Sequence, residues 1–332
     1  MLNLVVIVDA HWSGEIANRL AQVGRYHPSR TIVLAVEHGR KTIDAHVKLV
    51  ADVPDEAHEM ALTFENVIVH CGERHLSNLY TIVDPLVVTD LATLVWAPHG
   101  HHEAVDALLG IAQVVLIDSV DEPEVDEALD RAGQLSQSAY VVDLAWLRST
   151  PWRERLAATF DPPKLRPELR HISRVAIRHH PESEATAMLL IGWLAARLDW
   201  EPSPLVARKG ELHGKAHARR QDIHFELAPE PEQSVRGLAA LELETASGRF
   251  LRLSRGPGGL RADYKHTRGV EREWTILGAS RGEAGILGEG IRQALLRDQT
   301  YKPALEKARA LLGGRRPADR LTAAPGRRQG DF

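Results

Sequence analysis

The sequence predicts an α/β protein with two domains. Strands alternate with helical segments of about 10 to 15 residues over the first 161 residues, which is typical of a doubly wound, mostly parallel sheet. A proline-rich break follows, Asp161-Pro162-Pro163 with Pro167, and an almost wholly apolar helix and a series of hairpins lie beyond it. With 332 residues the chain also exceeds the ~250 to 300 residues at which a single core stops growing. We therefore predict a Rossmann-like α/β domain over residues 1–161 and an α+β domain, with antiparallel strands and a buried core helix, over 162–312.

In the first domain most of the expected strands are short, nearly continuous apolar runs, as in a sheet that helices cover on both faces. The expected helices have apolar residues at three- and four-residue spacing on one side. We predict strands at 2–8, 31–36, 91–96, 114–117 and 140–142, and helices at 14–23, 103–111, 125–135 and 152–160.

Residues 42–50 differ from these strands because apolar and polar side chains alternate along them. The apolar set is Ile43, Ala45, Val47 and Leu49, and the polar set is Asp44, His46 and Lys48. This period predicts a half-exposed strand near an edge of the sheet, antiparallel to its neighbour.

The segment 69–100 is the centre of the first domain. A strand ends at His70 and Cys71, Gly72 allows the chain to turn, and a helix is expected from Glu73 until Pro85 ends it. An acidic residue suits the first turn of a helix because of the helix macrodipole.

The second domain is expected to form around the apolar helix 185–198. Strands are predicted at 222–227, 237–244, 249–253 and 260–264, with glycine-containing hairpin turns between the last three, and closing helices at 283–296 and 303–312. Residues 313–332 carry five arginines against two aspartates and show almost no periodicity, which predicts a disordered basic tail.

The composition argues against nucleic-acid and membrane partners. The net charge is -4 and the sequence pI is about 6.5, so no overall attraction to nucleic acid or anionic lipid is expected. No run approaches the ~18 apolar residues of a membrane span. The one cysteine, Cys71, cannot form an intramolecular disulfide, so we expect a cytoplasmic protein.

Histidines are abundant, and a group near the strand ends suggests a metal site as one hypothesis. The group is His70, Cys71, His75, His99, His101 and His102. It lacks a second cysteine or a carboxylate at ligand spacing, and part of it lies in a loop. We therefore predict no metal site.

The sequence also lacks the patterns that mark cofactor sites and catalytic sets. The first strand leads into Asp9-Ala10-His11-Trp12-Ser13-Gly14, without a G-x-G-x-x-G or P-loop pattern. No serine lies in a nucleophile elbow. We predict no cofactor and no catalytic residue. A ligand crevice remains an alternative, formed at the strand ends by Asp9, Asp118 and Ser119 with Glu73 and His75, although an aspartate in such a position more often caps a turn or helix.

Tryptophans and arginines cluster between residues 143 and 154. Trp146, Arg148, Trp152 and Arg153 flank Thr150-Pro151, which is a helix start signal. Tryptophan and arginine are enriched at interface hot spots. Two readings stay open: these side chains form a partner interface, or the tryptophans fix the junction between the domains.

Several short stretches of the sequence resemble a known family, the glucose-6-phosphate dehydrogenase assembly proteins named OpcA, in their actinobacterial form. The resemblance rests on short stretches that cover most of residues 69–200. They are Glu73-Arg74-His75, Asp90-Leu91, Val95-Trp96, the VLIDS run at 115–119, DLAWLRSTPWRERLAATFD at 143–161 and GWLAARLDW at 192–200.

The resemblance implies a non-catalytic protein that binds glucose-6-phosphate dehydrogenase, favours its active oligomer and raises its affinity for glucose 6-phosphate in the oxidative pentose phosphate pathway. The residues expected at the interface are Glu73, Arg74, His75, Trp146, Arg148, Trp152 and Arg153. The alternative is a sensor or enzyme that binds a sugar phosphate or nucleotide in the crevice of the first domain.

Overall fold

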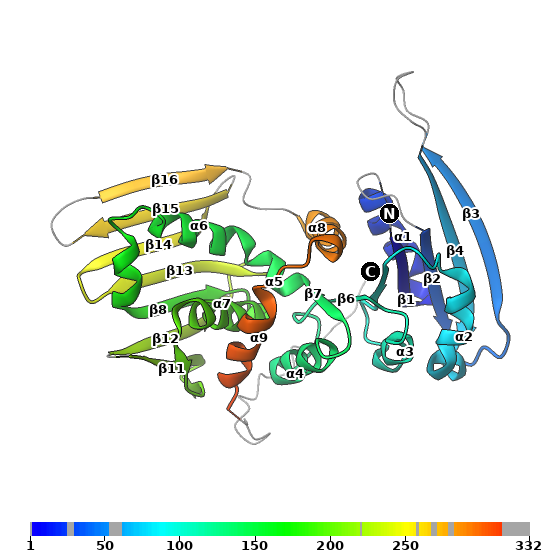
Figure 1. Ribbon diagram of the computed structural model, residues 1–332, viewed down its shortest axis with the longest axis horizontal. Coiled ribbons are helices and arrows are strands. Elements are labelled where there is room, and N and C mark those ends of the chain that lie inside the picture. The colour runs from blue at the N-terminus through cyan, green and yellow to red at the C-terminus, as the bar shows by residue number, and fades with distance from the viewer. Residues whose placement is uncertain are drawn as a thin grey trace.

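The computed structural model of this chain describes residues 2–24, 30–52, 62–219, 221–256, 259–266, 271–277 and 282–313. The tail expected beyond residue 313 lies outside this described part. Two sheets dominate the fold, one built from strands before residue 144 and one from strands after residue 171 (Figure 1).

The first sheet has the strand order β3-β4-β2-β1-β5-β6-β7. Apart from β3, which runs antiparallel to β4, neighbouring strands of this sheet are parallel. The strands are β1 (Asn3–Asp9), β2 (Arg30–Glu37), β3 (Asp44–Asp52), β4 (Leu62–Gly72), β5 (Thr93–Trp96), β6 (Val114–Ile117) and β7 (Tyr140–Asp143). This arrangement confirms the predicted doubly wound, mostly parallel sheet.

Strand β3 forms one edge of the sheet, as its alternating pattern predicts. Its register with β4 is unbroken from Asp44 opposite His70 to Asp52 opposite Leu62. The described side chains of the strand are exposed on both faces. The opposite edge, β7, is covered, because α5 and α8 pack against it.

Helices cover the first sheet where the sequence predicts them, with one difference after β4. The elements are η1 (Ala10–Trp12), α1 (Ser13–Gly24), α3 (His102–Leu108) and α4 (Val125–Leu135). The helix expected from Glu73 is instead a 3-10 segment η2 (Glu73–Asn78), a short α2 (Leu79–Val83) and η3 (Asp84–Leu86). Asn78 leaves the helical region (φ -117°, ψ 20°), as an asparagine that favours caps over helix interiors readily does.

The second sheet has the order β10-β11-β12-β8-β13-β14-β15-β16, with β9 paired to β11. It is antiparallel except where β12 runs parallel to β8. The strands are β8 (Ile172–His179), β9 (Glu201–Pro202), β10 (Val206–Arg208), β11 (Glu211–Ala218), β12 (Gln221–Pro229), β13 (Leu238–Thr245), β14 (Arg249–Gly256), β15 (Gly259–His266) and β16 (Glu271–Leu277). The antiparallel-rich second half is thus confirmed.

One buried helix packs on this sheet, as predicted. It is α7 (Glu184–Leu198), preceded by η4 (Arg166–His171) and η5 (Pro181–Ser183). Ten of its residues are buried, from Ala185 to Ala195. At Gly192, α7 comes so close to α9 (Tyr301–Ala310) that an added Cβ would lie 2.1 Å from the Ala304 carbonyl oxygen.

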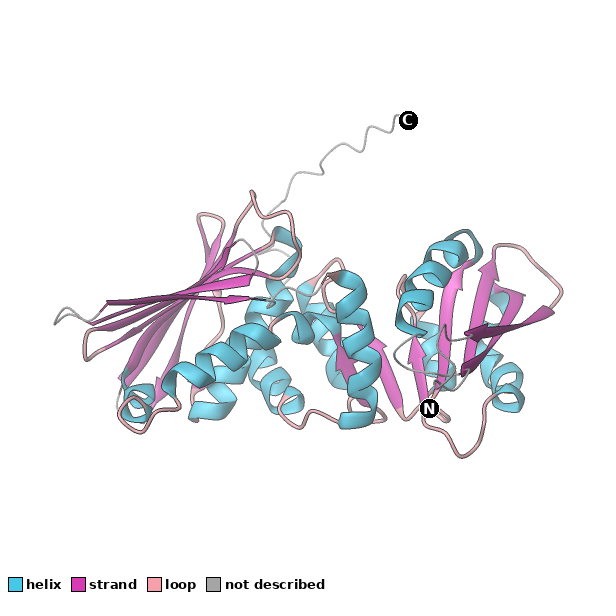
Figure 2. Ribbon diagram, turned by 90° about the horizontal axis from the view of Figure 1, so that it is seen from above, coloured by secondary structure: helices cyan, strands magenta, loops and turns pink. Residues whose placement is uncertain are grey.

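The C-terminal helices return to the first half of the chain. Helix α8 (Glu283–Leu296) packs on α1, on α5 (Leu144–Arg148) and on strands β6 and β7, while α9 packs on α7 and α4. Together with α6 (Thr150–Phe160) these helices fill the space between the two sheets (Figure 2). No helix in the described ranges is long and apolar enough to cross a membrane.

Candidate functional site

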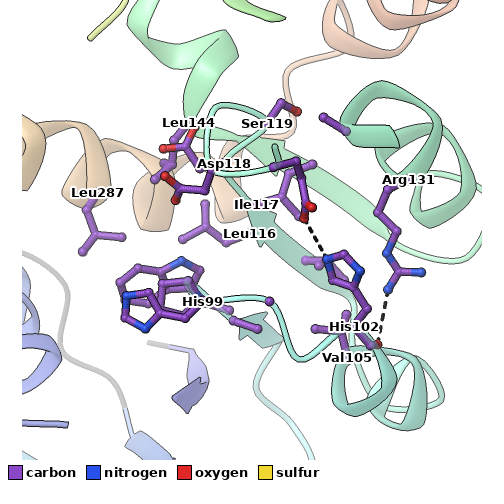
Figure 3. A pocket seen from close by; sticks show the side chains of 18 of the residues that line it. His99, His102, Val105, Leu116, Ile117, Asp118, Ser119, Arg131, Leu144 and Leu287 are labelled. Carbon is purple, nitrogen blue, oxygen red and sulfur yellow. Dashed lines mark hydrogen bonds and ion pairs between the residues drawn. The ribbon is translucent and has the colours of Figure 1, made fainter. Parts of the chain in front are cut away.

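A crevice of about 860 Å³ opens at the carboxyl ends of β5 and β6. Its walls come from the loop after β5, from the turn after β6, from α1 and from α8, so both halves of the chain contribute. Figure 3 shows His99, Leu116, Asp118 and Leu287 around this opening. The crevice lies beside β1 and β5, where the strand order of the sheet reverses, which is the usual ligand position in open α/β sheets.

Aromatic side chains occupy the first strand-to-helix turn beside the crevice. The rings of Trp12 and His99 lie 5.2 Å apart between centroids, and His11 lies 5.1 Å from Trp12 on its other side. In dinucleotide-binding proteins this turn is rich in glycine, so that the pyrophosphate can approach the helix N-terminus. Here His11 and Trp12 occupy that turn, and His99 faces Trp12 from the loop after β5.

The innermost charges of the crevice are paired. Asp118, at the end of β6, accepts two hydrogen bonds from Arg148 of α5, Nη1–Oδ1 at 2.8 Å and Nη2–Oδ2 at 2.7 Å. Arg148 also binds Glu283, the first residue of α8, with Nη2–Oε2 at 2.6 Å. Burial alone would raise the pKa of Glu283, but the hydrogen bonds from Arg148 bring it below its ordinary value. The three residues therefore connect β6, α5 and α8.

A second ion pair crosses the crevice between the two halves of the chain. Arg236, just before β13, binds Asp121 at 2.6 Å and Glu182 at 3.3 Å. Burial, followed by the negative charge of Asp118, raises the pKa of Asp121. Partial burial lowers the pKa of His99.

Other charged side chains of the crevice wall form pairs too, whereas His99 contacts the Trp12 ring. His102 binds Glu122 with Nε2–Oε1 at 2.7 Å, Arg131 binds Asp106 at 2.6 Å, and Arg19 binds Glu15. Figure 3 also shows Arg131 directed at the backbone of His102, whose carbonyl oxygen accepts a longer hydrogen bond of 3.4 Å.

Asp143 stabilises the backbone beneath the crevice through hydrogen bonds. Its carboxylate is fully buried and accepts hydrogen bonds from the Ser119 backbone N–H (3.1 Å) and hydroxyl (2.7 Å), the Ala145 N–H (2.9 Å) and the Tyr301 hydroxyl (3.0 Å). Burial and the nearby charge of Asp118 raise the pKa of Asp143 to about 6. This carboxyl group joins β6, β7 and α9 at one point.

The structure buries Trp146, Arg148, Trp152 and Arg153, which the resemblance placed at a partner interface. The Trp146 indole N–H donates to Asp298 Oδ2 at 2.8 Å, and the Arg153 guanidinium lies 3.4 Å from the centroid of the Trp146 ring. Each of the four is at most 8% exposed. Their position at the contact between α5, α6 and the turn before α9 agrees with the alternative reading, in which they fix the junction.

Glu73, Arg74 and His75 lie away from the crevice, at the carboxyl end of β4. Two strands, β2 and β1, separate them from β5. Glu73 and Arg74 are exposed. Glu73 binds His38 at 3.1 Å, and Arg74 donates to the backbone carbonyl of Lys41, just before β3. This part of the expected interface is accessible.

Only some of the residues that the sequence suggested for the crevice line it in the structure. Asp118 and Ser119 line it, whereas Glu73 and His75 do not. Asp9 lies at the end of β1 and binds His101 Nε2 at 3.1 Å. In the described part of the chain no three histidine, cysteine, aspartate or glutamate side chains are grouped so that they could hold a metal ion.

Sequence reasoning missed three residues that hold the site together, Arg236, Glu283 and Asp298. Each lies more than 100 positions from its partner in the first half of the chain. The sequence offered only a weak indication of their role. Glu283 begins a predicted helix and Asp298 follows it, and charged residues at helix ends are common for reasons of capping and helix dipole.

Two family models match the sequence. The one described as the glucose-6-phosphate dehydrogenase subunit N-terminal domain matches residues 7–134, and the one described as the C-terminal domain of the same subunit matches residues 139–305.

Curated relatives named OxPP cycle protein OpcA also match. The relative from Nostoc punctiforme is 26% identical over 224 residues, which are 64% of this chain and 48% of the relative. The relative from Synechocystis is 30% identical over 145 residues, 42% of this chain and 30% of the relative. This chain thus spans at most about half the length of these two relatives.

Among solved structures, the probable oxidoreductase yhhX gives a TM-score of 0.50 at 11% identity and covers 94% of this chain and 95% of its own. The oxidoreductase yvaA from Bacillus subtilis gives 0.50 at 12% identity, with 94% and 96% covered. Gal80p from Saccharomyces cerevisiae gives 0.50 at 8%, with 90% and 84% covered. At these identities the likeness concerns the fold alone.

Proposed function

This chain belongs to the OpcA family of glucose-6-phosphate dehydrogenase assembly proteins, and from that premise we propose that it is a non-catalytic assembly factor for glucose-6-phosphate dehydrogenase. It binds the dehydrogenase, favours its active oligomer and raises its affinity for glucose 6-phosphate. The proposal places the protein in the cytoplasm, with the dehydrogenase as its partner and with no nucleic acid or membrane involved.

The proposal that the protein is not an enzyme rests mainly on the ion pairs between charged side chains in the crevice. Asp118 is held by Arg148, Asp121 by Arg236, Glu122 by His102, and the arginines at the rim are paired in turn. A catalytic acid, base or phosphate-binding cation must be available to the substrate. The pairs of Asp118, Asp121, Glu122 and Arg131 join different elements and support a scaffold role, and Trp12 lines the crevice at the turn where a nucleotide site would need glycine.

An activator of this kind works by differential binding. It must bind the competent state of the dehydrogenase more tightly than the incompetent one, and allosteric couplings are typically ~1 to 3 kcal/mol, or roughly 5- to 150-fold in affinity. By linkage, glucose 6-phosphate then tightens the complex by the same factor.

We place the partner surface around Glu73 and Arg74, which are exposed on the turn after β4. The buried residues Trp146, Arg148, Trp152 and Arg153 act at a distance in this proposal. Trp146 and Arg153 bind Asp298 in the turn before α9, Arg148 ties α5 to Asp118 and Glu283, and Trp152 is buried in α6. In the proposal these contacts hold the two sheets in the orientation that the partner meets.

A glucose 6-phosphate saturation curve tests the proposal. The dehydrogenase of the same organism is titrated at fixed nicotinamide cofactor, with and without this protein. We expect the curve to move to lower substrate concentration and the shift to saturate as protein is added. No shift, together with separate elution of the two proteins on a sizing column, would refute the proposal.

The second candidate is a sensor or enzyme that binds a sugar phosphate or nucleotide, and the size of the crevice is the observation in its favour. A thermal-shift screen separates the two functions. Stabilisation of this protein by a metabolite in the absence of any dehydrogenase supports the sensor, because a ligand that binds only the native state raises the unfolding temperature.

A further inference from the structure

Within the described ranges, strand β3 pairs only with β4 and forms an edge of the first sheet. It has nine residues, lacks proline, and pairs with β4 without a bulge over its whole length. Proteins usually protect such an edge by shortening, twisting or covering it, because unpaired backbone groups invite another strand. The edge strand β10 of the second sheet, by comparison, has three residues. In Figure 1 no helix lies beyond β3.

Large apolar side chains are exposed along this edge. Val47 is 69% exposed, Leu49 66%, and Ile43, immediately before the strand, 47%. The three share one face because successive residues of a strand point to opposite sides. Scattered apolar side chains are normal on a surface, but these three, with Ala45 between Ile43 and Val47, follow one another on one side of the strand and form a contact strip. On the same strand the Ala45 N–H donates to Asp44 Oδ1 at 2.9 Å.

The sequence of the strip is complementary to itself in one register. When two copies run antiparallel about His46, Ile43 lies opposite Leu49 and Ala45 opposite Val47 on one face, and Asp44 lies opposite Lys48 on the other. The two-fold axis repeats each of these pairs. Directly opposite residues are the interacting units of a sheet, and opposite charges there are favourable.

Neighbouring registers lack this match. Pairing about Lys48 sets Lys48 against itself and Asp44 against Asp52, and pairing about Val47 sets Asp44 against Val50. The first register sets like charges directly opposite each other, which destabilises a sheet, and the second leaves the Asp44 charge opposite an apolar residue without its Lys48 partner.

We propose that two copies of this chain pair through β3, antiparallel about His46, to form a two-fold dimer with one sheet continuous across both copies. Such a contact is isologous and closed, because the same strip faces itself. Backbone hydrogen bonds supply the attraction, and the Asp44–Lys48 pairs fix the register. The proposal does not depend on a dehydrogenase, because the isolated chain carries the whole surface.

The mass of the isolated full chain in solution tests the dimer first. Analytical ultracentrifugation at tens of micromolar should give twice the 36.8 kDa of one chain. Lys48→Asp sets two aspartates opposite each other twice and should weaken the dimer at least tenfold. The combined Asp44→Lys and Lys48→Asp variant restores the opposite charges and should dimerise within about threefold of the original chain.

A matched apolar control is available on the other exposed edge. Val47→Asp should abolish the dimer, whereas Val206→Asp, on β10 and 53% exposed, should leave it unchanged. Because both valines are exposed in the single chain, each variant should still fold, which a cooperative unfolding transition at a concentration below dimerisation would show. Equal loss of dimer in the two variants would overturn the assignment to β3.

A cysteine reporter tests the register. Opposite residues of antiparallel strands have Cα atoms about 4.5 to 5.5 Å apart, within the disulfide range. His46→Cys should therefore form a linked dimer on mild oxidation. Lys48→Cys should not, because its two copies lie about 13 Å apart along the strands, four residues at 3.3 Å each. The native Cys71 is fully buried and does not interfere. A chain that sediments as one copy, or cross-links equally at both positions, overturns the proposal.

Discussion

Arg148 and Asp118 face each other in a two-pronged ion pair, with nitrogen–oxygen distances of 2.8 and 2.7 Å and both side chains almost completely buried. The bidentate geometry is the strongest that arginine forms with a carboxylate. It fixes α5 to the end of β6, and the bond from Arg148 to Glu283 brings the start of α8 to the same point. The packing of α8 on the first sheet therefore depends on this pair.

Replacing one partner of the pair should be costly. Arg148→Met leaves the buried Asp118 carboxylate without its counter-charge, and we expect a loss of about 3 to 5 kcal/mol in the free energy of unfolding. Arg166→Met is the control, because Arg166 pairs with Asp161 on the surface and should cost no more than about 1 kcal/mol. Adding Asp118→Asn to Arg148→Met should recover part of the loss in urea titrations. Equal effects of Arg148→Met and Arg166→Met would contradict the role given to the buried pair.

Trp146→Phe tests the contact between α5 and the turn before α9. The substitution removes the indole hydrogen bond to Asp298 and weakens the contact with the Arg153 guanidinium. Trp200→Phe is the matched control: Trp200 is equally buried and stacks on Phe225, but among the described residues its indole makes no comparable bond. We expect Trp146→Phe to cost about 1 to 2 kcal/mol more than Trp200→Phe in the free energy of unfolding. A smaller loss at Trp146 would exclude this contact as a main support of the junction.

The burial of Trp146 and Trp152 illustrates what the sequence could and could not predict. Repeating patterns located most strands and helices, including β3, whose alternation indicated an exposed edge. They did not reveal β11, whose inward positions carry the small residues Gly214 and Ala216, or α5, which is too short for a helical period. Tryptophan and arginine are enriched both at interfaces and at buried junctions, so residue type alone could not assign Trp146.

The candidate site was predictable only in part, for a related reason. Asp118 and Ser119 follow a recognisable buried strand, so their place at a strand end could be predicted. Their partners come from other elements: Arg148 of α5 binds Asp118, and Asp143 of β7 accepts from Ser119. Glu283 joins Arg148 only when α8 folds back on the first sheet. No local sequence pattern predicts that α8 packs back on the first sheet.

Asp143 should make stability depend on pH. Its pKa is raised to about 6 by burial and by Asp118, so the folded protein binds this proton more tightly than the unfolded chain does. The stability gained from protonation is full below the ordinary aspartate pKa and is lost as the pH rises through about 6. Asp143→Asn keeps a neutral side chain at every pH. The unfolding free energy of Asp143→Asn minus that of the wild type should therefore increase by about 1 to 2 kcal/mol from pH 5 to pH 7.

The control for this titration is Asp126→Asn, a partly exposed carboxylate at the start of α4. Its difference from the wild type should stay flat over the same range. A flat difference for Asp143→Asn would show that this carboxyl group titrates alike in the folded and unfolded states.

The proposed partner surface can be tested without disturbing the fold. Arg74→Glu reverses an exposed charge, and exposed substitutions usually change stability by no more than about 0.5 kcal/mol. We expect it to raise at least tenfold the amount of protein needed for half-maximal activation of the dehydrogenase. Arg208→Glu makes the same charge change on β10 and should leave activation unchanged. Wild-type activation by Arg74→Glu would move the interface elsewhere.

Gly192 marks the closest approach of α7 and α9, and its replacement should be among the most damaging small changes in the chain. A Cβ at this position would lie 2.1 Å from the Ala304 carbonyl oxygen and 2.8 Å from the Ala308 nitrogen, both of them backbone atoms of α9. Gly192→Ala must therefore push the helices apart, and we expect a loss of at least about 1 to 3 kcal/mol, the usual cost of overpacking. Gly14→Ala in α1 meets no atom within 4 Å and should be neutral or gain up to about 1 kcal/mol from helix propensity. Opposite signs for the two substitutions in denaturant titrations are the expected result. A neutral Gly192→Ala would mean that α9 is not held against α7 in solution, and with it the Asp143–Tyr301 bond at the start of α9 would lose its support.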